Sequence, residues 1–156
     1  MSRMIDSFYE IYNSPFLLAN YFLFAYKNLP ASKNNALLAY LVLPIVLYPP
    51  SANFLKNAKA TSSLVSFRKG KERIAGLPNR ISHYKEVTNQ CLQYLMDNNL
   101  LCVDENMTVH INKDANLPDA KTIEELAAAK LSIIFQLSLC ISFDISFFNI
   151  FSLIII

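Results

Sequence analysis

Few residues in this sequence have the types and spacing that catalysis or metal binding requires. Three cysteines, Cys91, Cys102 and Cys140, stand far apart without a Cys-x-x-Cys pair, and His83 and His110 are too isolated to complete a zinc site. With two glycines the chain forms neither a dinucleotide-binding nor a P-loop motif, and it has no Gly-x-Ser-x-Gly nucleophile motif. We therefore expect no bound metal, no cofactor and no enzymatic activity, and reduced cysteines in a cytoplasmic protein.

Two pairs of adjacent acids are the remaining candidates for acid–base chemistry. Asp104 and Glu105 fall in the turn of a predicted β-hairpin, and Glu124 and Glu125 fall in the first turn of a predicted helix. Acidic residues at such positions are commonly solvated or favoured by the positive end of the helix dipole. We therefore expect structural rather than catalytic roles for both pairs.

Positive charge is concentrated in residues 51–90, where eight basic groups stand against two acidic ones, while residues 91–130 carry a net charge of −4. Such a basic segment suits contact with DNA phosphates or with an acidic partner surface, although a solvated loop has the same composition. The candidate contact residues are Arg68, Lys69, Lys71, Arg73 and Arg80.

The chain is richer in apolar residues than a soluble monomer of its size requires, with 53% hydrophobic and 17% charged residues. The excess must be buried in a partner or in a membrane. The apolar runs 16–26 and 36–48 each give roughly 18 Å of helix against a hydrocarbon core of about 30 Å, so they are predicted to be buried core helices.

The third apolar run, 131–156, is long enough to span a membrane and has a single charged residue, Asp144. Its several Ser, Gln and Asn residues and the lack of a basic flank at its far end argue against a membrane anchor. We expect it to pack on the domain or on a partner. Candidate partner-binding residues are Phe147, Phe148, Phe151 and Leu153.

The elements that position these residues are predicted to be mainly helices, because glycine is rare and Leu, Ala and Lys are common. Helices are predicted in the first half of the chain over 16–27, 36–47, 51–55 and 61–68. Pro15 suits the first position of a helix, whereas Pro44 is expected to kink or end one. The segments 48–50 and 77–79 are predicted to break the chain, and 69–73 is predicted to be a solvated loop.

A long amphipathic helix is predicted over 81–96, where apolar residues recur every three or four positions, and a small β-hairpin is predicted over 100–111. A helix followed directly by a hairpin is the skeleton of a winged helix. Thr122 and Glu125 have the spacing of a capping box at the start of another helix, which extends to Phe135.

We expect a mainly α fold with a small β-hairpin. A winged-helix-like single domain is predicted over 1–130, followed by the apolar C-terminal segment 131–156. Residues 136–147 fit both a helical and a strand-like periodicity, so their conformation stays open.

Several segments, in consistent order over about residues 11–112, resemble the middle component of bacterial three-component ABC systems; Lamassu-type anti-phage systems have a similar component. The combination of the second and third segments is the most specific. The segments are Asn13-Ser14-Pro15-Phe16, Leu41-Val42-Leu43-Pro44-Ile45-Val46-Leu47-Tyr48-Pro49, Thr61-Ser62-Ser63-Leu64-Val65-Ser66-Phe67, and the helix and hairpin from Ile81 to Ile111.

The resemblance implies a small winged-helix-like protein without enzymatic activity, encoded beside an SMC- or Rad50-like ATPase and a variable effector, often a nuclease. Its expected role is an adaptor that links the two in an anti-phage or anti-plasmid defence complex, with double-stranded DNA reached through the complex. The C-terminal segment departs from the pattern, because relatives tend to end in a Gly-containing, partly basic segment.

Two other functions remain open from the sequence. A free-standing winged-helix regulator predicts sequence-specific DNA binding without partners. A small membrane-associated protein predicts that deletion of residues 131–156 makes the chain soluble.

Overall fold

Helices form most of the described chain, and its strands form a two-stranded antiparallel hairpin. The computed structural model describes residues 14–112 and 119–140. The elements, in chain order, are α2 (Pro15–Lys27), η1 (Asn35–Leu38), α3 (Ala39–Val46), α4 (Pro49–Lys56), α5 (Leu64–Lys69), α6 (Lys71–Ile74), α7 (Leu77–Asp97), β1 (Leu101–Val103), β2 (Val109–Ile111) and α8 (Ile123–Cys140). This confirms the predicted fold class, mainly α with a small β-hairpin.

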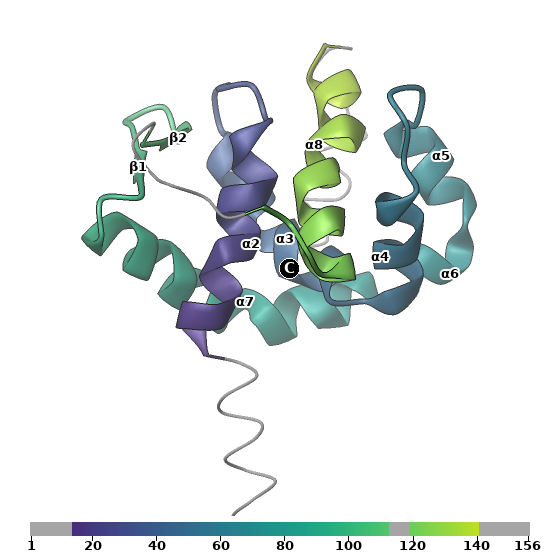
Figure 1. Cartoon of the computed structure of the whole chain (residues 1–156), viewed down its shortest axis with the longest axis horizontal. Helices are drawn as coiled ribbons and strands as arrows, with labels where there is room; N and C mark the ends of the chain where they lie inside the picture. Colours follow the sequence, from purple (N-terminus) through teal and green to yellow (C-terminus); the bar gives the residue numbers. More distant parts are fainter. Residues whose placement is uncertain (1–13, 113–118, 141–156) are drawn as a thin grey trace, which may run out of the picture.

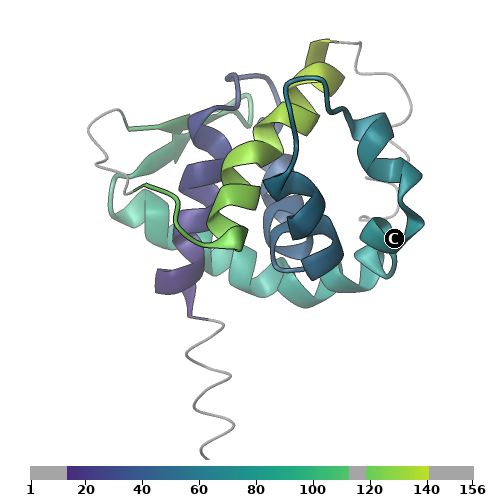
Figure 2. The ribbon, with the colours of Figure 1, turned by 45° about the vertical axis from the view of Figure 1, so that its right-hand side comes forward.

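Helix α8 lies at the centre of the arrangement, between α2 on one side and α4 on the other (Figure 1). The long helix α7 runs along one end of these helices, where it packs against α2 and α3 (Figures 1 and 2). The hairpin follows α7 and contacts α2, while α4, α5 and α6 form the opposite side of the molecule (Figure 1). The two sides therefore carry different elements around one shared core.

The hydrophobic core draws one large side chain from each of the five main helices. These side chains are fully buried, and they are Phe22 of α2, Leu43 of α3, Leu55 of α4, Leu95 of α7 and Ile134 of α8. Burying each such side chain stabilises the fold by about 1.5–3 kcal/mol. The prediction that the first two apolar runs are buried core helices is confirmed.

Helix α8 continues across residue 130, where the sequence suggested that the C-terminal segment begins. Leu131, Ile134 and Phe135 are buried in the core, and the helix ends at Cys140. The first ten residues of the segment are therefore helical, while residues 141–156 lie outside the described residues. The division of the chain at residue 130 stays a prediction.

Prolines stand in the first turns of three of the described helices: Pro15 in α2, Pro49 and Pro50 in α4, and Pro78 in α7. The predicted breaks at 48–50 and 77–79 are therefore wrong in part, since α4 begins at Pro49 and α7 begins at Leu77. The first N–H groups of a helix have no intrahelical acceptor, so a proline there costs no hydrogen bond.

Proline inside a helix has the effect that the sequence predicted. Pro44 lies in the last turn of α3, which ends two residues later at Val46. The chain then turns by 104° between the segment Asn35–Val46 and α4. This bend brings the C-terminal end of α3 toward the start of α7, where Arg80 contacts it.

The hairpin is held to the helical body by the segment that leads into η1. Leu101 pairs with Ile111 and Val103 with Val109 in the antiparallel register. The N–H of Asn34 donates to the carbonyl of Asn106 at 3.0 Å, and the N–H of Ala36 donates to the carbonyl of Met107, also at 3.0 Å. The hairpin turn is therefore bonded to a segment some 70 residues away in sequence.

The start of α8 confirms the predicted capping box. The N–H of Glu125 donates to Thr122 Oγ1 at 3.1 Å, and the N–H of Thr122 donates to Glu125 Oε2 at 2.9 Å. The bond from the Thr122 N–H to the carboxylate holds the pKa of Glu125 below its usual value, together with a further bond from the Lys121 N–H. Both side chains satisfy donors that the first helical turn leaves free.

We expect Thr122→Ala to lower the free energy of unfolding by about 1 kcal/mol, because it removes one capping acceptor. Urea denaturation followed by circular dichroism measures this loss. Thr61→Ala is the matched control, since Thr61 is exposed and lies outside the helices. An equal loss in both variants would contradict the capping role.

Candidate interaction surface

The five basic residues predicted to contact DNA or an acidic partner divide into two groups. Arg68, Lys69 and Lys71 are exposed, whereas Arg73 and Arg80 are half-buried. The segment 69–73, predicted to be a solvated loop, is mostly helical: Lys69 ends α5, Gly70 separates the helices, and residues 71–73 belong to the short helix α6. The two groups therefore have different surroundings.

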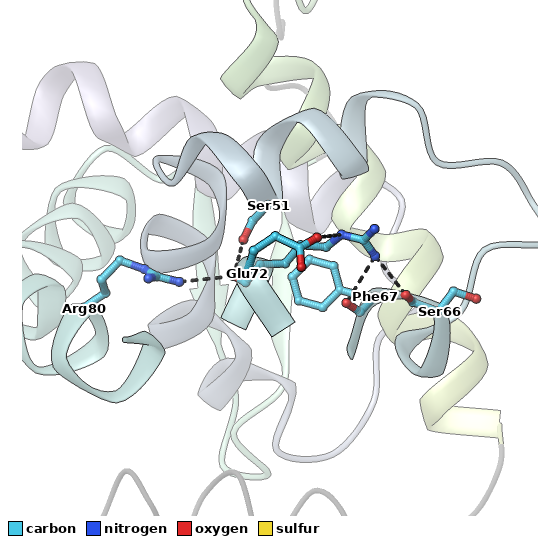
Figure 3. Close-up of polar contacts among 6 residues, drawn as sticks. Ser51, Ser66, Phe67, Glu72 and Arg80 are labelled. Atoms are coloured by element: carbon cyan, nitrogen blue, oxygen red, sulfur yellow. Dashed lines mark hydrogen bonds and ion pairs between the residues drawn. The ribbon is translucent and has the colours of Figure 1, made fainter. Parts of the chain in front are cut away.

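Arg73 links α6 to the C-terminal end of α5 and to α4. Its Nη1 donates to the carbonyl of Ser66 at 2.9 Å and to that of Phe67 at 3.4 Å (Figure 3). Its guanidinium lies over the ring of Phe54, 4.1 Å from the ring centroid, and its Nε lies 3.5 Å from a carboxylate oxygen of Glu72. These contacts place the charge of Arg73 against free carbonyls at a helix end, where a cation is stabilising.

Arg80 holds together the ends of α3 and α6. Its Nε donates to the carbonyl of Pro44 at 3.0 Å, and its Nη2 donates to the carbonyl of Arg73 at 3.3 Å. Its Nη1 also donates to the carbonyl of Ala75. The guanidinium lies 3.7 Å from the centroid of the Tyr48 ring. Partial burial lowers the pKa of Arg80.

The carbonyl of Arg73 is the point where α4, α6 and α7 meet. It accepts the hydroxyl of the fully buried Ser51 at 2.7 Å as well as the bond from Arg80 (Figure 3). A third cation acts in the same way elsewhere: Lys130 Nζ donates to the carbonyls of Lys56 and Ala58 at the C-terminal end of α4. Three cations therefore satisfy the carbonyl ends of short helices, and the sequence analysis did not identify this role.

The exposed group remains available to a partner. The side chains of Arg68, Lys69 and Lys71 make no hydrogen bond or ion pair with any described residue. Arg68 and Lys69 belong to α5 and Lys71 to α6, on the side of the molecule formed by α4, α5 and α6 (Figure 1). Lys56 at the end of α4 and Lys59 just after it are also exposed. Glu72 is an exposed acid among them. This side of the molecule, called here the basic side, is thus a candidate surface for a negatively charged partner.

One acid of each pair considered for catalysis, Asp104 and Glu125, has structural partners. Asp104 Oδ1 accepts the N–H groups of Asn106 and Thr108, and its Oδ2 lies 3.1 Å from His110 Nε2. The bond with His110 and the backbone bonds hold the pKa of Asp104 below its usual value. Asp104 therefore organises the hairpin turn, in agreement with the structural role predicted for it.

The described cysteines and histidines do not come together. Cys91 is fully buried, and burial raises the pKa of its thiol to about 12, whereas Cys102 is exposed on β1. His83 contacts the ring of Tyr84, with ring centroids 4.9 Å apart. Residues 14–112 and 119–140 hold no group of three His, Cys, Asp or Glu side chains arranged for a metal ion.

Two further predictions concern the apolar excess. The candidate partner-binding residues Phe147, Phe148, Phe151 and Leu153 lie outside the described residues. Within the described ranges, no single helix has the length and apolar character needed to cross a bilayer. The bent pair Asn35–Val46 and Pro49–Lys56 meets those two criteria when taken together.

Most of the sequence matches one known protein family. Residues 2–138 match the family described as ABC-three component (ABC-3C) system Middle Component 3. The chain belongs to this family. The match extends from the segment before α2 nearly to the end of α8, so it includes all the described elements up to the last turn of that helix. No curated protein and no solved structure matches the chain significantly.

Membership in Middle Component 3 agrees with the resemblance noted in the sequence. A component of a three-component system works with other subunits, and this accounts for a chain whose apolar content exceeds the needs of its own core. Large apolar side chains are indeed exposed on the described surface, among them Phe16 and Leu17 at the start of α2 and Val65 on α5.

Proposed function

We propose that this Middle Component 3 protein is a non-enzymatic adaptor that links an SMC- or Rad50-like ATPase to an effector, such as a nuclease, in a cytoplasmic anti-phage or anti-plasmid defence complex. Its membership in the family over residues 2–138 carries the proposal. The exposed Phe16, Leu17 and Val65 supply apolar surface for partner subunits.

The basic side supports a contact with negative charge inside the complex, from double-stranded DNA or from an acidic surface of a partner subunit. Lys69 and Lys71 are exposed and their side chains are unpaired among the described residues, so their charges are available. Contacts of this type depend strongly on salt and carry little sequence specificity. They suit a subunit that positions other components rather than one that reads a DNA sequence.

A free-standing winged-helix regulator is less well supported by the charges of α7. This helix precedes the hairpin, and it carries Arg80 and Lys85 against Glu86 and Asp97. Arg80 is bonded to carbonyls within the fold. The helix therefore offers little net positive charge to DNA phosphates.

Affinity capture of the tagged chain after co-expression with the ATPase and effector encoded beside it tests the adaptor role. We expect both partners to be recovered with the chain at constant ratio. Recovery of the chain alone, as a monodisperse monomer at every salt concentration tested, would contradict the proposal.

Charge reversal on the basic side tests its contribution. We expect Lys69→Glu/Lys71→Glu to weaken binding of the complex to DNA or to its acidic partner. Where DNA is the ligand, the logarithm of the association constant should fall less steeply with the logarithm of the salt concentration. The magnitude of this slope should decrease by about 2, one for each lost contact. Lys33→Glu/Lys85→Glu is the matched control, because both lysines are exposed outside the basic side. Equal effects of the two double variants would show that net charge alone is responsible.

A further inference from the structure

An apolar pocket lies between α5 and α8, next to the basic side. It is lined by Leu64, Phe67 and Arg68 of α5, by Leu131, Ile134 and Phe135 of α8, and by residues of α3, α6 and α7. All of its solvent-facing lining surface is apolar, although Arg68 is one of the lining residues. Arg68 therefore contributes its methylene stem, which leaves its guanidinium at the rim.

The chain itself contains a segment suited to this pocket. Residues 141–156 follow α8 directly and lie outside the described residues. Eleven of these sixteen residues are Ile, Leu or Phe, so the segment needs an apolar surface to cover it. The other five are Ser, Asn and the single acid Asp144.

The position of the pocket on α8 brings it within reach of this segment. Ile134 lies six residues before the end of α8 at Cys140, which corresponds to about 9 Å along the helix axis. Four residues of extended chain span up to about 13 Å. A chain that reverses direction after Cys140 can therefore bring Asp144 level with the pocket and carry Phe147 and Phe148 across it.

Charge complementarity selects the alignment. Asp144 is the one charged residue in 131–156, and Arg68 is a cation at the pocket rim without a partner among the described residues. An exposed ion pair contributes little stability by itself, so burial of the apolar side chains supplies the binding and the pair fixes the register.

We propose that residues 141–156 fold back antiparallel to α8 and cover the pocket, with Asp144 paired to Arg68 and Phe147 against the apolar wall. This inference concerns the isolated chain and does not depend on the proposed adaptor function. It assigns one of the five predicted contact residues, Arg68, to a contact within the chain.

The chain has no tryptophan, and Phe147→Trp in the full-length protein therefore introduces a single tryptophan whose fluorescence reports on this segment. We expect emission that is blue-shifted relative to a free tryptophan amide and independent of protein concentration. Adding Arg68→Glu should shift the emission to the red, and adding Asp144→Arg to that variant should restore it. Lys69→Glu is the matched control, because it makes the same charge change one residue away from the pocket lining.

Emission typical of solvent-exposed tryptophan in the Phe147→Trp protein would overturn the proposal. An emission maximum that is unaffected by Arg68→Glu, or affected equally by Lys69→Glu, would also overturn it. A blue shift that is lost on dilution would instead show binding to a second copy, and one that arises only after addition of a partner subunit would place the segment on that partner. Failure of this test leaves the capture of ATPase and effector unaffected, so the two proposals are judged separately.

Discussion

Replacing Arg80 by methionine should lower the free energy of unfolding by roughly 3 kcal/mol, which is a large loss for a single substitution. The carbonyls of Pro44, Arg73 and Ala75 lose a charged donor, and Tyr48 loses the cation over its ring. Methionine retains much of the apolar stem, so the loss reports on the guanidinium rather than on packing. Equilibrium urea denaturation of the purified chain measures it.

Two further variants test this interpretation of Arg80. Lys85→Met removes an exposed cation from the same helix and should change stability by less than about 0.5 kcal/mol. Arg80→Lys keeps the charge but cannot direct three donors at three carbonyls, so it should recover less than half of the loss. Full stability in Arg80→Lys would show that charge alone, rather than hydrogen-bond geometry, holds the ends of α3 and α6.

Replacing Asn35 by alanine should destabilise the fold by about 2 kcal/mol, because it leaves a buried donor without an acceptor. Asn35 is 2% exposed, and its Oδ1 accepts the N–H of Val109 on β2 at 2.7 Å. Its own carbonyl accepts the hydroxyl of the buried Tyr26 at 2.8 Å. One residue thus connects α2 and η1 to the hairpin, which lies some 70 residues further along the chain.

The loss at Asn35 should be greatest near the hairpin. Hydrogen exchange of the Val109 amide should become faster than that of core amides in α2, since its acceptor is removed. Asn89→Ala is the control: Asn89 also accepts a side-chain hydrogen bond, from Tyr40 at 2.7 Å, but it does so at the surface. A change in stability as small as that of Asn89→Ala would rule out the linking role of Asn35.

Several elements follow from local sequence alone, and the structure confirms them. The capping box of Thr122 and Glu125 needs only residues three positions apart, and the hairpin needs two short strands with a turn between them. The apolar runs of α2 and α3 predict that these helices are buried in the core, because each run is too short to span a bilayer, and the structure has them buried. Helix starts at proline were predicted only at Pro15, since the same residue type also ends helices.

The roles of the basic residues, in contrast, were decided by tertiary structure. Sequence composition placed Arg68, Lys69, Lys71, Arg73 and Arg80 in one group. The fold directs Arg73 and Arg80 to helix ends and leaves Arg68, Lys69 and Lys71 exposed. Lys130 reaches the end of α4 across more than 70 residues, so no local pattern identifies it.

The sequence by itself therefore determined that this chain is helical, rich in apolar surface and free of recognisable catalytic motifs, and its family follows from the same residues. Tertiary structure decided which cations remain available to a partner. The physical reason is the separation of the partners along the chain. The hydrogen bonds of a capping box form within one helical turn, whereas Arg80 and Lys130 reach their acceptors only after the bend between α3 and α4 has brought helix ends against α7 and α8.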